Sequence, residues 1–73
     1  MYPITLHDKL KYAREEAGYT QEQVANFLHI SRTTLANYEL GYRNPNLDTL
    51  ALLCDFYCIS ADWLLGTRGG KKE

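Results

Sequence analysis

The sequence predicts a compact all-α domain of five short helices. The first observation is the length of 73 residues, for which one domain is the expected number. The second is a series of helix start and stop signals that divides the chain into five segments. The third is that no segment alternates apolar and polar residues as a half-buried strand would. We expect the domain to occupy residues 1–66 and a polar, flexible tail to occupy residues 67–73.

The first two helices are expected to begin after threonine caps. Thr5 precedes residues 6–17, with Asp8 close to a capping-box position, and Gly18 is a suitable left-handed stop. Thr20 precedes the second helix, which carries Gln23 at its capping-box position. The residues expected on the buried faces are Leu6, Leu10, Ala13 and Ala17, then Val24, Ala25 and Leu28.

The last three helices have equally local signals. Ser31 caps residues 32–40, which Gly41 ends. Asn46 caps residues 47–57, and Pro45 disfavours an earlier start. The final helix is short: Ser60 caps residues 61–65 and Gly66 ends them. The expected core stripe of the fourth helix is Leu47, Leu50, Leu53, Cys54 and Tyr57.

Only three residues join the second and third helices: His29, Ile30 and Ser31. A connection this short forces a sharp crossing, as in a helix-turn-helix. Ile30 is expected to fill the corner between the helices. His29 is expected to make the turn with positive φ, where glycine is easiest and His is less penalised than most residues. A phosphate contact is the second interpretation of His29.

The third helix combines an inward face, Leu35 and Tyr38, with a polar outward face. Arg32 can bind guanine O6 and N7, Asn37 can bind adenine N6 and N7, and the Thr33 methyl can contact the thymine methyl. A nine-residue helix is ~13 Å long and fits the ~12 Å major groove of B-DNA. Spacing alone is equally compatible with an ordinary solvated helix surface.

Charge and cysteine content limit the other classes of function. A net charge of -1 and a pI of about 6.1 argue mildly against nucleic-acid binding, although residues 29–44 are slightly basic. Cys54 and Cys58 are too few for a disulfide scaffold, so a reducing cytoplasm is expected. A metal site would need them together with His7 and His29, whose spacing follows no zinc pattern. We therefore expect no metal, no cofactor, no signal peptide and no membrane span.

From residue 20 to 41, and then through RNPNLDTLALLCDFYCISADWLLG, the sequence resembles the lambda-repressor and Cro-type (XRE-like) helix-turn-helix family. The resemblance runs from about residue 6 to 66. Its markers in the helix-turn-helix are Gln21 at the start of the second helix, Ala25 at the crossing of the two helices, and the pair Ile30-Ser31 before the third helix. Further markers are the segment YELG, which ends the third helix, and the segments RNP and LDTLALL that follow it. His29 departs from the usual glycine. The resemblance implies a sequence-specific transcriptional regulator of double-stranded DNA, and a phage- or mobile-element-type repressor is expected.

The resemblance also implies roles for individual residues. Base reading falls to Arg32, Thr33 and Asn37 of a recognition helix covering residues 31–40. Arg14 and Glu39 match a structural ion pair. The positions that match phosphate contacts are Gln21, Ser31, Thr34, Tyr42, Arg43 and Asn44.

Family members commonly bind two half-sites as two-fold dimers. An inverted-repeat operator and a weak homodimer are therefore the expected partners. Leu52, Phe56 and Trp63 form the candidate dimer interface, because the family usually has polar residues at the first and last of these positions. The alternative is that Trp63 folds back to complete a small core.

Two other classes of function are alternatives to DNA binding. A protein-interaction module or antitoxin that retains the fold is the second reading, although it has no need of three base-capable side chains on one helix face. An enzyme is not expected, since the chain has no Ser/His/Asp set, no glycine-rich phosphate loop and no paired carboxylates in a pocket. No small-molecule ligand is evident from the sequence.

Overall fold

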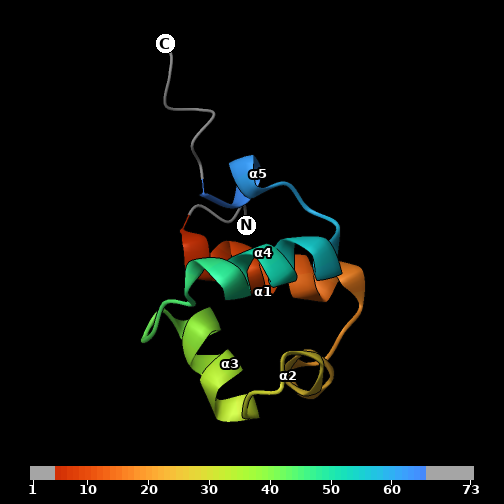
Figure 1. Cartoon of the computed structure of the whole chain (residues 1–73), viewed down its shortest axis with the longest axis vertical. Helices are drawn as coiled ribbons and strands as arrows, with labels where there is room; N and C mark the ends of the chain where they lie inside the picture. The colour runs from red at the N-terminus through yellow and green to blue at the C-terminus, as the bar shows by residue number, and fades with distance from the viewer. Residues whose placement is uncertain (1–4, 66–73) are drawn as a thin grey trace.

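A computed structural model describes residues 5–65, and within that range it contains five α-helices and no strand (Figure 1). The helices are α1 (Leu6–Ala17), α2 (Gln21–Leu28), α3 (Arg32–Leu40), α4 (Leu47–Tyr57) and α5 (Ala61–Leu65). The predicted all-α class and the predicted helix bounds are confirmed. The predicted stop at Gly66 and the predicted tail, residues 67–73, lie outside the described residues.

Side-chain caps explain where the helices begin. In each of the first four, the cap oxygen accepts a hydrogen bond from the backbone N–H three residues on, which satisfies one of the free donors of the first turn. Thr20 and Gln23 form a complete capping box, as predicted. Ser60 Oγ accepts from the backbone N–H of Trp63 at 3.0 Å, so the short α5 has the same kind of start. The four caps are Thr5, Thr20, Ser31 and Asn46.

Four helices end in the left-handed conformation. Gly18 and Gly41 have φ of 85°, as glycine allows without a Cβ penalty. His29 has φ of 59°, which confirms that a non-glycine residue makes the turn of the helix-turn-helix. Cys58 has φ of 58°, a second non-glycine stop that the sequence did not indicate.

All five helices contribute buried residues to the core: α1 packs against α3, α4 and α5, and α2 packs against α3. Two predicted core residues are wrong. Leu47 is 75% exposed because, as the first residue of α4, it projects beyond the packed part of the helix. Ala17 is exposed in the last turn of α1. The buried apolar residues are Leu10, Ala13, Val24, Ala25, Leu35, Tyr38, Leu50, Leu53, Cys54, Tyr57 and Leu64.

The helices separate the molecule into two ends. Figure 1 shows α2 and α3 at one end, α1 and α4 packed across the middle, and α5 at the other end. Lys9 Nζ donates a hydrogen bond of 2.8 Å to the backbone carbonyl of Trp63, which fastens α5 to α1. The helix-turn-helix is therefore presented at one end, on a support formed by α1 and α4.

Candidate nucleic-acid interface

The polar face of α3 points away from the core. Leu35 and Tyr38 are buried, whereas Arg32 and Thr33 are exposed and Asn37 is half-buried. This division follows the helical repeat, since residues three and four apart share a face. The structure therefore places the three predicted base-reading residues on one helix, at the end of the molecule that it shares with α2.

Two predicted phosphate contacts meet at the start of α3. Ser31 Oγ accepts a hydrogen bond of 3.0 Å from the backbone N–H of Thr34, and the two hydroxyl oxygens lie 2.9 Å apart. Free backbone N–H groups and the helix dipole make such an N-terminus suitable for an anion. The arrangement holds both hydroxyls at the position where a phosphate would approach α3.

A buried ion pair joins α1 to α3. Arg14 Nε donates to Glu39 Oε2 at 2.7 Å and Arg14 Nη2 donates to Oε1 at 3.2 Å, while Nη1 donates to the carbonyl of Tyr19 at 2.8 Å. The relative exposures are 9% for Arg14 and 5% for Glu39. The hydrogen bond to Glu39 raises the pKa of Arg14 even though burial opposes the charged form. The ion pair that the resemblance implied is present, and it joins the last turn of α3 to α1.

Gln21 extends this pair to the polar face of α3. Its Nε2 donates to Glu39 Oε1 at 3.0 Å, and its Oε1 accepts from Arg32 Nη1 at 3.2 Å. A predicted phosphate contact and a predicted base reader are thus hydrogen-bonded to each other. No local signal in the sequence indicates this link, because 11 positions separate the two residues and only the crossing of the helices brings them together.

The loop between α3 and α4 is solvent-facing. Tyr42 is 77% exposed, and Arg43 and Asn44 are exposed as well. The backbone N–H groups of Tyr42 and Arg43 both donate to the carbonyl of Asn37, at 3.0 and 3.3 Å. Those two N–H groups already have an acceptor. The Arg43 guanidinium is therefore the strongest hydrogen-bond donor that the loop can offer to a phosphate.

The sequence did not indicate a cleft that lies beside α3. The cleft has a volume of about 450 Å³ and lies between α1, α2 and α3, with Gln21 and Ala36 in its wall. Lys11 of α1 lines the same cleft. Lys11 was not predicted as a phosphate contact, because it belongs to the first helix and only the fold brings α1 beside α3. Lys11 joins the candidate phosphate contacts.

The predicted dimer residues do not form one cluster. Phe56 stacks on Phe27 with ring centroids 4.1 Å apart, and on Tyr19 at 4.6 Å. Trp63 packs against α1, with its ring centroid 6.3 Å from that of Tyr12. Leu52 is the most exposed of the three, at 48%. Phe56 and Trp63 thus contribute to packing on different elements.

The described residues also include two cysteines, neither of which is in a disulfide. Across residues 5–65, no three His, Cys, Asp or Glu side chains gather as metal ligands would. Cys54 is a buried free thiol and Cys58 an exposed one, and burial raises the pKa of the Cys54 thiol. None of the helices in this range has the length and apolar character required to cross a membrane.

Comparison with known proteins identifies the fold family. Residues 10–64 match the family model described as helix-turn-helix, which covers most of the chain. The chain belongs to this helix-turn-helix family. The match begins within α1 and ends within α5, so the family pattern includes the supporting helices as well as the helix-turn-helix pair.

Several curated relatives from Bacillus subtilis (strain 168) resemble this helix-turn-helix chain. It is 48% identical over 63 residues to the HTH-type transcriptional regulator ImmR, covering 86% of this chain and 50% of the relative. It is 37% identical over 65 residues to the regulator AnsR, with coverage of 89% and 56%. It is 40% identical over 58 residues to the SPbeta prophage-derived uncharacterized regulator YonR, with coverage of 80% and 54%. The chain spans about half the length of these relatives.

Proposed function

We propose that this chain is a sequence-specific DNA-binding transcriptional regulator that reads double-stranded DNA through the recognition helix, residues 31–40. The observation that carries the proposal is the outward face of α3. Arg32, Thr33 and Asn37 project from one helix whose opposite face is anchored in the core. The naming of the relatives as HTH-type transcriptional regulators supports the same function.

Base recognition would follow from hydrogen-bonding geometry. Arg32 would donate two hydrogen bonds to a guanine, Asn37 would pair with an adenine, and the Thr33 methyl would contact a thymine. Each bidentate contact contributes about 1–3 kcal/mol of discrimination against the wrong base. The Gln21 amide, which is hydrogen-bonded to Arg32, would hold the guanidinium in place before DNA arrives.

Phosphate contacts would set the position of the helix in the groove. The candidates surround α3: its own N-terminus, the start of α2 and the loop that follows it. They are Gln21, Ser31, Thr34, Tyr42, Arg43 and Asn44, with Lys11 added by the cleft. Because the chain has a net charge of -1, we expect weak non-specific binding and a specificity that comes mainly from base contacts.

Repression by occupancy is the mechanism that needs the fewest groups beyond the DNA-binding surface itself. A domain bound at an operator excludes polymerase sterically and requires no catalytic group or cofactor. The prophage origin of one relative, YonR, supports a repressor of phage or mobile-element type. Such a regulator would act in the cytoplasm, where DNA is available.

Two copies on an inverted repeat complete the proposal. A weak homodimer would place two recognition helices about one DNA turn apart, roughly 34–36 Å. Leu52, Phe56 and Trp63 remain the proposed interface, with Leu52 offering the most exposed apolar surface. Sedimentation that shows only monomer at tens of micromolar would remove the dimer from the proposal.

Selection on a random double-stranded DNA pool tests the function. The protein is selected first at low salt and then near physiological salt, and the retained DNA is sequenced. Enrichment of an inverted repeat with half-sites about 10 base pairs apart is the expected result. No enrichment by a folded protein would overturn the proposal and favour the second candidate, an interaction module or antitoxin.

A further inference from the structure

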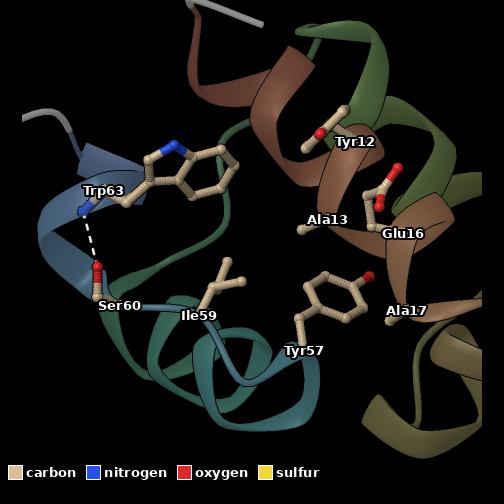
Figure 2. Close-up of a pocket in the computed structure, with 8 residues that line it drawn as sticks. All are labelled: Tyr12, Ala13, Glu16, Ala17, Tyr57, Ile59, Ser60 and Trp63. Carbon is tan, nitrogen blue, oxygen red and sulfur yellow. Dashed lines mark hydrogen bonds between the residues drawn. The ribbon is translucent and has the colours of Figure 1, made fainter.

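A pocket lies at the end of the molecule away from α2 and α3. It has a volume of about 410 Å³, opens to solvent and lies between α1, the end of α4 and α5 (Figure 2). Ligand pockets in proteins typically range from about 300 to 1,000 Å³. The proposed DNA contacts do not use this pocket, so its chemistry needs a separate explanation.

Aromatic rings form much of the wall. Tyr12 of α1 and Trp63 of α5 face the pocket from two helices, and the ring of Tyr57 lines it from the end of α4 (Figure 2). The faces of such rings attract cations, with tryptophan the most effective. The ring of Trp63 already attracts one cation, because Lys9 Nζ lies 5.5 Å from its ring centroid.

A carboxylate stands beside the rings. Glu16 lines the pocket one helical turn after Tyr12, so both side chains project from the same face of α1. Within residues 5–65, the Glu16 carboxylate makes no hydrogen bond and no ion pair. Its neighbour Glu15 differs, since it lies 4.0 Å from Arg14 and does not line the pocket.

Tyr57, which also lines the pocket, carries a buried hydroxyl without a partner in the described residues. Tyr57 is 6% exposed, and its hydroxyl has no hydrogen-bond partner among the described residues. Figure 2 shows this hydroxyl directed toward α1, on the side where Glu16 and Ala17 lie. Buried polar groups are normally hydrogen-bonded, and an unpaired one often indicates an absent water or ligand.

We propose that this pocket binds a small organic cation with an apolar body, held between the Glu16 carboxylate and the rings of Tyr12 and Trp63. The charge of the ligand follows from the Glu16 carboxylate, which has no basic partner within residues 5–65, and from the ring faces, which attract cations. The apolar body follows from the rings and Ile59, which provide a largely apolar wall. Binding here does not depend on the DNA-binding function, because the two sites lie at opposite ends of the molecule.

The chain contains its own reporter of this binding. Trp63 is the single tryptophan, so all tryptophan fluorescence, excited near 295 nm, comes from a residue that lines the pocket. The probe is 3-hydroxyphenyltrimethylammonium, and the control ligand is 3-tert-butylphenol, which has nearly the same shape without the charge. We expect saturable quenching or shift of the emission by the cation, and affinity for the uncharged compound at least about tenfold lower.

Two matched carboxylate variants test the assignment. Glu16→Gln is expected to weaken binding of the cation about tenfold and to leave binding of the uncharged compound unchanged. Glu15→Gln removes a neighbouring charge outside the pocket and is expected to leave both affinities unchanged. Circular dichroism on each variant checks that the helices are intact.

Three results would overturn the proposal. These are the absence of saturable binding, equal affinity for the charged and uncharged compounds, or equal effects of Glu15→Gln and Glu16→Gln. All titrations are made without DNA, so that a negative outcome says nothing about operator binding and the two proposals fail separately.

Discussion

One buried ion pair gives α3 its fixed position relative to α1. Arg14 and Glu39 are joined by two side-chain hydrogen bonds, and both are nearly excluded from solvent. A buried pair of this kind does not by itself imply high stability, because removing two charges from water is costly. Loss of one partner is a different matter, since the other charge remains buried and unpaired.

Arg14→Ala is therefore expected to lower the free energy of unfolding by about 3–5 kcal/mol and to weaken DNA binding as a consequence. Urea denaturation followed by circular dichroism measures the first effect. Arg43→Ala is the control, because Arg43 is exposed and surface substitutions usually change stability by less than about 0.5 kcal/mol. A fully stable Arg14→Ala protein that has lost DNA binding would show that Arg14 contacts DNA instead.

His29 makes a left-handed turn that glycine would make more easily. A non-glycine residue in this region costs about 1–3 kcal/mol, partly offset because glycine gains freedom in the unfolded chain. We expect His29→Gly to raise the melting temperature slightly and His29→Val to lower it, since a β-branched residue is least tolerated there. Calorimetry on both variants and the unaltered protein measures the three melting temperatures. A lower melting temperature for His29→Gly would indicate that the imidazole makes a stabilising contact.

Among the elements, α2 and α4 are held together by an aromatic stack that the sequence did not predict. The rings of Tyr19, Phe56 and Phe27 lie one on another with interplanar angles of 22° and 13°. Phe56, the central ring, comes from α4, whereas Phe27 comes from α2. The stack explains why a residue predicted at a dimer interface contributes to packing within one chain.

Phe56→Ala is expected to lower the free energy of unfolding of the monomer by about 3 kcal/mol. This is the lower end of the range for a buried phenylalanine, because the ring is only half-buried. Leu52→Ala, one turn earlier and more exposed, is expected to have little effect on unfolding of the monomer. Urea denaturation at several protein concentrations separates packing from assembly. A loss for Phe56→Ala that appears only at high protein concentration would show that Phe56 stabilises the dimer and not the fold of one chain.

The helices were predictable because their signals are local. A cap such as Thr20 and its capping-box partner Gln23 lie three residues apart, so the sequence alone specifies the start of α2. Burial was less predictable at helix ends, where Leu47 follows the apolar spacing yet projects past the core. The link from Gln21 to Arg32 and the lining of the pocket depend on how the helices cross, and no local signal encodes a crossing.

For the whole molecule, charge decides how DNA binding should depend on salt. Few basic side chains are available near α3, and Arg14 is already paired with Glu39. We expect non-specific binding only at low salt. Arg43→Ala should lower affinity for every DNA sequence by a similar factor and reduce the slope of log K against log salt by about 1. Anisotropy titrations at several salt concentrations measure the slope, and an unchanged slope would place Arg43 away from the phosphates.

Direct reading of bases by α3 is the central claim. The measurement that tests it most directly is a random-pool DNA selection carried out in parallel on the unaltered protein, Arg32→Ala and Arg43→Ala. Arg32→Ala is predicted to lose the preference for guanine at one position in each half-site and to keep the rest of the motif. Arg43→Ala is predicted to keep the whole motif. An Arg32→Ala protein that is folded and selects the original motif in full would contradict the claim.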